Sequence, residues 1–393
     1  MAPALYSVAR KECVLRSKIL LVDDDEMLLA GLKRQLRNRF RVDTAISGED
    51  AVRMVTENGP YAVVVSDYMM PGMNGIELLR RVKQTNPHTI RMMLTGSADM
   101  TTAIKAVNEG SIYKFHPKPC PAETLGEAIQ SGIEAYQKVM TDQTRLKNVQ
   151  KHLTDASRLQ QNLKPKFEPQ IDGYDIAGRS IPCDETGGDY YDFIHPNEWD
   201  QDKIGIVVAD VIGHGISAAL LMASVRASFR ERILSPGSGI SIVSDVNKRL
   251  VQDIEELNLF ITMFYSEIDI KEKCFRWVHA GHESALSYDP APDTFETLGG
   301  DGLPLGVMKG WVYKEAMIPI HPGQIILIGT DGIKEACNPL HEHFGNERLQ
   351  MIIKYNHQKS ARDILDEVYN ALERFRGSAE RKDDETMVVI KVL

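Results

Sequence analysis

Five short apolar runs alternate with amphipathic helical patterns in the first third of the chain, and no other feature constrains the fold as much. Between Lys18 and about Glu134 the runs are KILLV, FRVDTA, YAVVVS, RMML and IYKF. Strands that alternate with helices pair in parallel, because each helix returns the chain to the same end of the sheet. Residues 17–135 are therefore predicted to form an α/β domain with a five-stranded parallel sheet and helices on both faces.

A long polar stretch without proline follows, from about Thr124 to Leu163. Apolar residues recur in it at heptad-compatible spacing, and Gln160 interrupts the series Leu146, Val149, Leu153, Ala156, Leu163. The pattern fits a plain connector helix or a dimeric coiled coil, and it favours the coiled coil. Pro165 and Pro169 end the helix, because proline breaks the helical hydrogen-bond ladder. We assign residues 136–166 to this linker and expect a homodimer through it.

Residues 167–393 show a different pattern. Strand-like stretches, KIGIVVAD, FITMFYSEIDI, QIILIGTD and TMVVIKVL, are mixed with two helical patterns near residues 216–233 and 239–255. Segregated strands and helices are typical of an α+β domain.

Composition limits the classes of function. The chain has 393 residues, of which 43% are hydrophobic, so it can build two or three domains. A net charge of −9 disfavours direct nucleic-acid binding, which needs a basic surface. With no long apolar run and no signal-peptide pattern, a cytoplasmic protein without membrane contact is expected. The five cysteines never form CxxC, which predicts no disulfide framework and no zinc site.

Polar residues end successive strands of the predicted parallel sheet. Asp23, Asp24 and Asp25 follow the first run and Asp67 the third, while Thr95 and Lys118 follow the fourth and fifth. The carboxyl ends of parallel strands open onto one edge, where ligands bind. Clustered carboxylates favour Mg²⁺, and a nearby hydroxyl and ammonium suit phosphoryl transfer onto Asp67.

Four motifs in order strengthen this interpretation. VDDDE (22–26), SDYMMPGMNG (66–75), LTG (94–96) and KP (118–119) resemble those of CheY-like receiver domains, whose fold is flavodoxin-like. One motif alone fits ordinary polar residues at strand ends, but four in register do not. The resemblance implies a cognate histidine kinase and a set of roles. Asp67 is the phosphoacceptor and also a magnesium ligand, together with Asp24, Asp23 and the Met69 carbonyl. The switch residues are Thr95, Lys118 and Phe115.

The string TGGDYYDF at residues 186–193 nearly spells the GGDEF signature of nucleotide cyclases. Such an enzyme needs a second aspartate on an earlier strand of the same domain. The preceding residues, RLQQNLKPKFEPQ, are a helix end and a proline-bounded linker, which leave no room for that strand. Asp189 must therefore find its partners downstream.

Three further acidic sites stand at predicted strand ends: Asp210, Asp331, and the pair Asp383 and Asp384. Together with Asp189 they can hold two divalent cations and a bridging water that attacks phosphorus, so no serine, cysteine or histidine nucleophile is needed. His214 in GHG and His282 in AGH are candidate proton donors, although loop histidines of this kind are more often structural.

Residues 157–393 resemble the SpoIIE/RsbU branch of the metal-dependent PPM phosphatases, which has a β-sandwich flanked by helices. The resemblance rests on ASRLQQNLKP, GGDYYDF, ADVIGHGISAAL, AGHESAL, GLPLGV, GTDGIKEACN, FGNERL and DDETMVVI. It implies two Mn²⁺ or Mg²⁺ ions and a ligand set of Asp189, Asp210, the Val211 carbonyl, Asp331 and Asp383. Asp384 and His214 are expected beside the ligands, although which of Asp383 and Asp384 binds metal stays open.

The two resemblances together predict a response regulator in which phosphorylation of Asp67 controls a protein serine/threonine phosphatase. The family likeness suggests a phosphorylated anti-sigma-factor antagonist of the STAS type as substrate, in a partner-switching pathway. The alternative is a phosphorylation-controlled adaptor that uses a catalytically weak phosphatase fold as a binding surface. The sign of regulation and the choice between Mg²⁺ and Mn²⁺ are left open.

Overall fold

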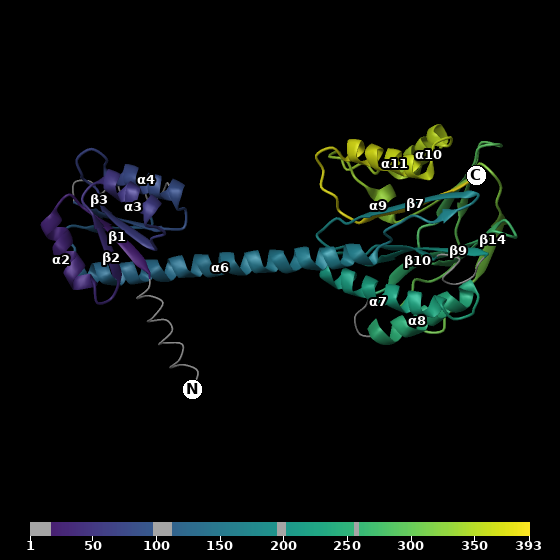
Figure 1. The fold of residues 1–393 in the computed structure, drawn as a ribbon, viewed down its shortest axis with the longest axis horizontal. Coiled ribbons are helices and arrows are strands. Elements are labelled where there is room, and N and C mark those ends of the chain that lie inside the picture. Colours follow the sequence, from purple (N-terminus) through teal and green to yellow (C-terminus); the bar gives the residue numbers. More distant parts are fainter. Residues whose placement is uncertain (1–16, 97–111, 195–201, 255–258) are drawn as a thin grey trace. The chain divides into compact units, whose positions relative to one another are not determined.

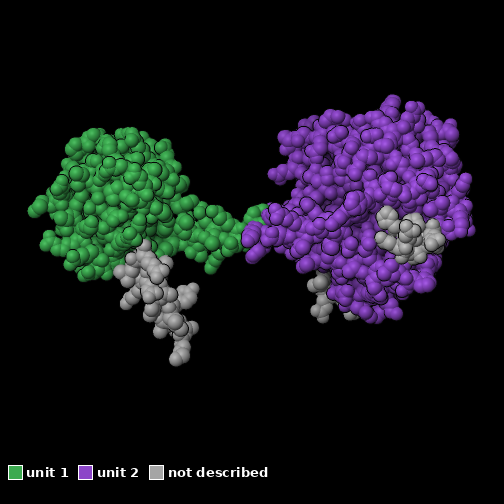
Figure 2. All heavy atoms as spheres, viewed as in Figure 1, with its two compact units in different colours: residues 1–150 green, residues 151–393 purple. Residues whose placement is uncertain are grey.

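The computed structural model describes residues 17–96, 112–194, 202–254 and 259–393. The chain divides into two compact units, residues 1–150 and 151–393, which are described separately (Figure 2). The predicted domain limits at residues 135 and 166 remain predictions. Among the described residues, no helix is long and apolar enough to cross a membrane.

The first unit contains the predicted five-stranded parallel sheet, in the order β2-β1-β3-β4-β5. The prediction of an α/β sheet is therefore confirmed, and strand limits shift by at most two residues. The strands are β1 Lys18–Val22, β2 Arg41–Ala45, β3 Val63–Asp67, β4 Ile90–Thr95 and β5 Lys114–Pro117. The central strand β3 is buried along its whole length, as expected for a strand covered on both faces.

Helices cover both faces of this sheet (Figure 1). On one face, leucines of α2 and the apolar start of α6 pack with the strands in one buried cluster. On the other, α3 and α4 form a second cluster with residues that alternate along the same strands. The helices are α2 Glu26–Leu36, α3 Gly48–Glu57, α4 Gly75–Thr85 and α6 Ala122–Leu163.

The linker prediction of a continuous helix is confirmed, since α6 runs unbroken for 42 residues. Its first turns are buried against the sheet through Leu125, Ile129 and Ile133. Farther along, the heptad residues Leu146 and Val149 are 69% and 56% exposed. The middle of α6 therefore presents apolar side chains with no partner in the described part of a single chain.

The second unit is a sandwich of two antiparallel sheets, as the family resemblance implied. One sheet has the order β14-β11-β10-β9-β8 and the other β13-β12-β15-β16-β7-β6. The strands of the first are β8 Tyr190–Ile194, β9 Lys203–Val211, β10 Ile261–Asp269, β11 Cys274–Ala280 and β14 Glu315–Pro319. Those of the second are β6 Gln170–Ile171, β7 Tyr174–Ile181, β12 Ala285–Asp289, β13 Thr294–Leu298, β15 Ile325–Gly329 and β16 Glu385–Val392.

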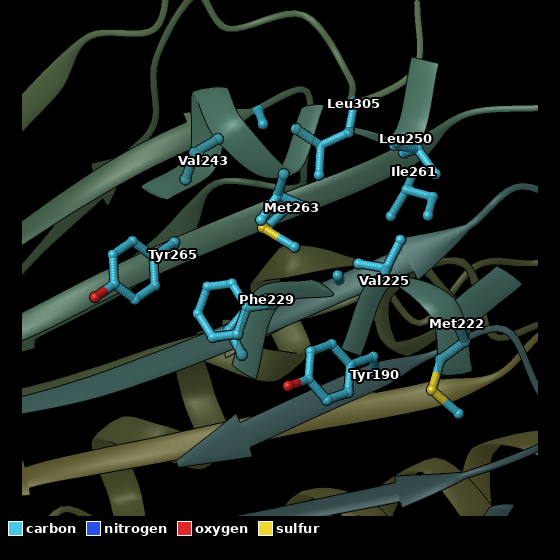
Figure 3. Close-up of a cluster of buried hydrophobic side chains, with 14 of the residues drawn as sticks. Tyr190, Met222, Val225, Phe229, Val243, Leu250, Ile261, Met263, Tyr265 and Leu305 are labelled. Atoms are coloured by element: carbon cyan, nitrogen blue, oxygen red, sulfur yellow. The ribbon is translucent and has the colours of Figure 1, made fainter. Parts of the chain in front are cut away.

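Alternation along the strands builds three buried layers. Residues between the sheets form one cluster. Those on the outer face of the β8–β11 sheet pack under α7 Ile216–Ile233 and α8 Gly239–Ile254, around Phe229, Tyr265 and Tyr190 (Figure 3). Neighbouring Tyr190 and Tyr191 thus enter different layers, and both tyrosines of TGGDYYDF are core residues.

Sequence analysis identified α7 and α8 but missed the helices on the other sheet. These are α9 Asp331–Glu335, α10 Gly345–Asn356 and α11 Ala361–Arg376. Ser360 caps α11 by accepting a hydrogen bond from the Asp363 N–H, a start signal that was readable in the sequence. Their buried apolar faces form the third layer with β15, β16 and β7.

Candidate functional site

The receiver pocket lies at the carboxyl ends of β1 and β3, as the parallel sheet requires. Oxygen atoms of Asp23, Asp24 and Asp67 all lie within 4.8 Å of one another. Asp23 and Asp67 are buried and Asp24 is exposed. An oxygen-only donor set that is open on one side suits Mg²⁺, which keeps part of its water shell.

Lys118 links the two buried carboxylates of this pocket. Its Nζ lies 2.8 Å from Asp23 Oδ2 and 2.6 Å from Asp67 Oδ1. Burial raises the pKa of Asp67, and the hydrogen bond from Lys118 opposes that rise. Burial also acts to lower the pKa of Lys118, but its bonds to Asp23 and Asp67 outweigh it and the pKa is raised. The lysine is therefore held charged beside the predicted phosphoacceptor.

The other predicted receiver residues surround this pocket. Thr95 is buried at the end of β4, and its hydroxyl donates to the Gly96 carbonyl at 3.2 Å. Phe115 lies on β5, half-buried against the α3/α4 cluster. The Met69 side chain is 66% exposed, in the loop that follows β3. The stretch after Gly96, residues 97–111, lies outside the described residues.

The second acidic centre lies at one edge of the sandwich and draws on both sheets. Asp189 precedes β8 and Asp210 lies near the end of β9, while Asp331 follows β15 and Asp383 precedes β16. The pKa of Asp210 is raised to about 9, first by burial and then by the charges of Asp189, Asp331 and Asp383. All four predicted aspartates therefore meet in one electrostatic environment.

Asp189 is the most buried of the four, at 1% exposure. Its Oδ2 accepts a hydrogen bond from Thr330 Oγ1 at 2.9 Å, while its Oδ1 is buried without a partner in the described structure. Burial, followed by the charge of Asp384, raises its pKa to about 7. A buried carboxylate oxygen with no donor costs free energy unless a cation meets it, so the donor set fits divalent metal ions.

Asp384 has a different environment from Asp383. Its carboxylate accepts hydrogen bonds from three backbone N–H groups, those of Cys183 at 2.8 Å, Gly188 at 2.6 Å and Asp189 at 3.2 Å. Asp384 therefore holds the 183–189 loop in place. Asp383 is exposed and acts on Asp210 and Asp331, which supports it as the metal ligand of the pair.

The paired glycines of TGGDYYDF allow this close packing. A Cβ at Gly187 would lie 2.2 Å from Asp384 Oδ2, and one at Gly188 would lie 2.9 Å from the Val211 carbonyl oxygen. Neither contact is sterically allowed, so only glycine lets the loop approach Asp384 and Val211. The predicted carbonyl ligand Val211 thus lies directly beside the backbone that carries Asp189.

The two candidate histidines differ sharply. His282 is 6% exposed, and its Nδ1 lies 2.7 Å from Thr262 Oγ1. Burial lowers the pKa of His282 to about 3, so it is a neutral, structural residue. His214 is exposed in the loop before α7, and its Nδ1 lies 2.5 Å from Asp184 Oδ2. The geometry favours His214 as the proton donor.

Gln160, the residue that breaks the heptad series, has a role that the sequence pattern does not predict. Gln160 is buried, and its side-chain amide bonds both backbone groups of Gly187. Its Nε2 donates to the Gly187 carbonyl at 2.5 Å, and its Oε1 accepts from the Gly187 N–H at 3.0 Å. The Leu163 carbonyl accepts a bond from Arg226 of α7 at 2.7 Å. The end of α6 is thus joined to the loop of Asp189.

Lys164, directly after α6, donates to Ser180 Oγ at 2.7 Å. Burial lowers the pKa of Lys164, although the charges of Asp189 and Asp384 act in the opposite direction. Asp192, also in TGGDYYDF, makes a two-pronged ion pair with Arg230 of α7, with Nε···Oδ2 at 2.6 Å. Neither contact had a signal in the sequence beyond the charge itself.

Several cavities open among the described residues of the second unit, and two of them bear on the site. One, of about 630 Å³, is lined by Trp277, His279 and Trp311, and none of the four aspartates lines it. The other, of about 390 Å³, runs beside Asp383 and is lined by His343, Lys382 and other residues.

The parallel sheet with its acidic pocket defines a receiver domain, and the two-sheet sandwich with its edge aspartates defines a phosphatase domain of the PP2C type. Family models agree: residues 19–130 match the response regulator receiver domain, and residues 200–393 match Stage II sporulation protein E (SpoIIE). The chain therefore consists of an N-terminal response regulator receiver domain and a C-terminal SpoIIE/RsbU-type phosphatase domain.

Individual relatives match the two parts separately. Phosphoserine phosphatase RsbU of Bacillus subtilis is 29% identical over 260 residues, which is 65% of this chain and 75% of RsbU. The hydrogenase transcriptional regulatory protein HoxA of Cupriavidus necator is 33% identical over 131 residues, 33% of this chain and 27% of HoxA. The SiaA PP2C domain of Pseudomonas aeruginosa shares the fold, with a TM-score of 0.56 at 20% identity over 63% of this chain and 99% of that domain.

Proposed function

We propose that phosphorylation of Asp67 controls the removal of phosphate from a phosphoserine or phosphothreonine on a partner protein, a STAS-type anti-sigma-factor antagonist. The observation that carries the proposal is the buried, unpartnered Asp189 Oδ1 among three further aspartates, in a chain that also holds a receiver pocket. The name of RsbU, a phosphoserine phosphatase, supports the same substrate class.

In the phosphatase domain, Asp189, Asp210, Asp331, Asp383 and the Val211 carbonyl would hold two Mn²⁺ or Mg²⁺ ions. When bound, such ions supply Lewis acidity toward the phosphoryl oxygens and activate water for in-line attack. The protein's own contribution is a rigid donor set: Thr330 fixes one oxygen of Asp189 and Asp384 fixes the loop backbone.

His214 supplies the proton that the leaving seryl or threonyl oxygen needs. It is exposed, so it can reach a phosphorylated side chain on another protein, and its Nδ1 bond to Asp184 orients the ring.

In the receiver, Asp23, Asp24, Asp67 and the Met69 carbonyl would hold Mg²⁺, and a cognate histidine kinase would supply the phosphoryl group. Lys118 already contacts Asp67 and is placed to neutralise phosphoryl oxygens. Thr95 would turn its hydroxyl from the Gly96 carbonyl toward the phosphoryl group, and Phe115 would follow as the switch aromatic.

The signal would reach the catalytic centre along α6. The bonds from Gln160 to Gly187, and from Arg226 to the Leu163 carbonyl, tie the end of this helix to the metal-site loop and to α7. Exposed Leu146 and Val149 support a homodimer in which the helices pair. We propose no membrane partner and no nucleic-acid partner for this protein, and we propose that it works in the cytoplasm.

The alternative of an adaptor with a weak phosphatase fold makes a different prediction. Dephosphorylation of an aryl phosphate and of phosphorylated STAS proteins is measured with Mn²⁺, with and without beryllofluoride on the receiver. We expect activity that Asp210→Ala abolishes and that beryllofluoride changes. Absence of activity, with partner function unchanged in Asp210→Ala, would refute the enzyme and favour the adaptor.

A further inference from the structure

Three residues beside the aspartate centre gather a sulfur, an oxygen and a nitrogen donor. Cys183 and Asp184 follow β7, and His214 lies between Gly213 and Gly215 before α7. One ligand atom from each lies within 4.8 Å of the other two. Among the described residues, this group and the receiver trio Asp23, Asp24 and Asp67 are the two sets of side chains close enough to share a metal ion. Because no CxxC motif is present, the cysteine spacing had predicted no zinc site.

The surroundings of this trio favour a cation. The charges of Asp384, Asp184 and Asp383 all act on the Cys183 thiol. The Cys183 N–H donates to Asp384, which fixes the backbone from which the thiol projects. Because burial and these carboxylates raise the pKa of Cys183 to about 12, the thiol without an ion is neutral and poorly nucleophilic. A redox or nucleophilic role for this cysteine is therefore disfavoured.

The donor types separate this group from the all-oxygen centre next to it. Carboxylates and carbonyls suit Mg²⁺ and Mn²⁺, whereas thiolate and imidazole select softer ions. Three mixed ligands with a fourth position open to solvent is a common Zn²⁺ arrangement. We propose that Cys183, Asp184 and His214 bind one Zn²⁺, and that this ion inhibits the phosphatase. Binding releases the thiol proton to solvent as the Cys183–Zn bond forms.

Zinc binding does not depend on the proposed function, but inhibition does. A Zn²⁺ on His214 and Asp184 would occupy a ring nitrogen of His214, which then cannot carry a proton, and would replace the hydrogen bond to Asp184 that orients the ring. This zinc ion would not displace the metal ions that we propose for Asp189, Asp210, Asp331 and Asp383. Zinc would therefore lower turnover without displacing Mn²⁺.

Cobalt spectroscopy tests the binding directly on the full chain. Co²⁺ is titrated into protein saturated with Mg²⁺, and the sulfur-to-cobalt charge-transfer band is followed. We expect one saturable equivalent, displaced by Zn²⁺. The band should vanish in Cys183→Ala and persist in Cys337→Ala, a matched control in which a partly buried cysteine lies 3.9 Å from His343 Nδ1. A band that survives Cys183→Ala, or that Cys337→Ala removes, overturns the site.

Inhibition is measured as aryl phosphatase activity with saturating Mn²⁺ and increasing Zn²⁺. Cys183→Ala should keep the zinc-free rate and raise the half-inhibitory Zn²⁺ concentration by about 100-fold, because loss of even an outer-shell partner costs about 10–100-fold in metal affinity. Equal inhibition of Cys183→Ala and wild type overturns the inhibitory role. A protein with no phosphatase activity but an intact cobalt band would refute the proposed function and not the zinc site.

Discussion

The two acidic centres of this protein balance their charge in different ways. In the receiver, Lys118 contacts both buried carboxylates and its pKa is raised by them. In the phosphatase domain, the nearby lysine is Lys164, which bonds Ser180 instead, and burial lowers its pKa. The comparison indicates that the receiver pocket holds one compensating charge from its own chain between its two buried carboxylates, whereas Lys164 makes no ion pair with the aspartates of the phosphatase centre in the described structure. The phosphatase centre therefore relies more on metal ions.

The largest effect should come from Asp189, and its neighbour Asp192 is the matched control within the same eight residues. Asp189→Asn removes a proposed metal ligand and should lower kcat by roughly 10²–10³-fold or more, as loss of strong electrostatic stabilisation does, with little change in folding. Asp192→Asn breaks the ion pair of buried Asp192 with the partly exposed Arg230 and should cost about 1–3 kcal/mol of stability. Activity and denaturant unfolding measured on both variants separate the roles; equal activity losses would contradict this assignment.

Without metal ions, the stability of the phosphatase domain should depend more strongly on pH than that of the receiver domain. Unfolded aspartates titrate near pKa ~3.9, while burial raises the pKa of Asp189 to about 7 and of Asp210 to about 9. Between the unfolded pKa of ~3.9 and the native pKa of about 9, the ion-free native state binds more protons than the unfolded state. The free energy of unfolding of the ion-free protein should therefore fall as the pH rises from ~4 to about 9, and stay level above that.

Hydrogen exchange of the full chain in chelator, at pH 6 and pH 9 after correction for intrinsic rates, checks this expectation. Protection of β9 and β16 should drop at the higher pH and return with Mn²⁺, while β1 and β3 should change much less. An equal loss in both units would show that Lys118 does not distinguish the two centres.

Asp67 and Lys118 test the receiver. Asp67→Asn should abolish the response of phosphatase activity to a phosphodonor and leave the basal rate intact. Lys118→Ala leaves Asp23 and Asp67 without their ammonium, so phosphorylation should slow by about 100-fold, the lower end of the loss expected for one charge-stabilising group. Phosphorylation is followed on Phos-tag gels. A phosphodonor response that persists in Asp67→Asn would refute the receiver assignment.

Gln160 tests the connection between α6 and the catalytic loop. Gln160→Leu keeps the size of the side chain but leaves the Gly187 N–H and carbonyl buried and unpaired, at about 1–3 kcal/mol each. We expect weaker Mn²⁺ activation and a smaller response to beryllofluoride. Gln161→Leu, one residue on and exposed, is the control and should behave as wild type.

The smallest effect concerns the middle of α6. Replacing exposed Leu146 and Val149 with Glu should weaken dimerisation, because like charges would meet across the paired helices, and leave the monomer's stability within about 0.5 kcal/mol. Sedimentation velocity measures the change, with Lys147→Glu as the control. A wild-type monomer at all accessible concentrations would exclude this dimer.

The sequence was sufficient where a short-range pattern determines the structure. Alternating apolar runs predicted the parallel sheet, and the strand ends predicted which aspartates gather at its edge. The long helix followed from the absence of proline. Helices α10 and α11 were not predicted, although α11 buries apolar residues at helical spacing and Ser360 and Asp363 form a capping signal at its start.

Only the tertiary structure decided how residues distant in sequence share a charge or a hydrogen bond. The proposal of Asp383 rather than Asp384 as a metal ligand rests on three backbone N–H groups, about 200 residues earlier in the chain, that donate to Asp384. The role of Gln160 depends on Gly187, and the Cys183–Asp184–His214 group forms only when two loops meet. Residue types and strand ends fix the available chemistry, whereas long-range packing sets burial and partners, and these determine which carboxylate is left for a metal.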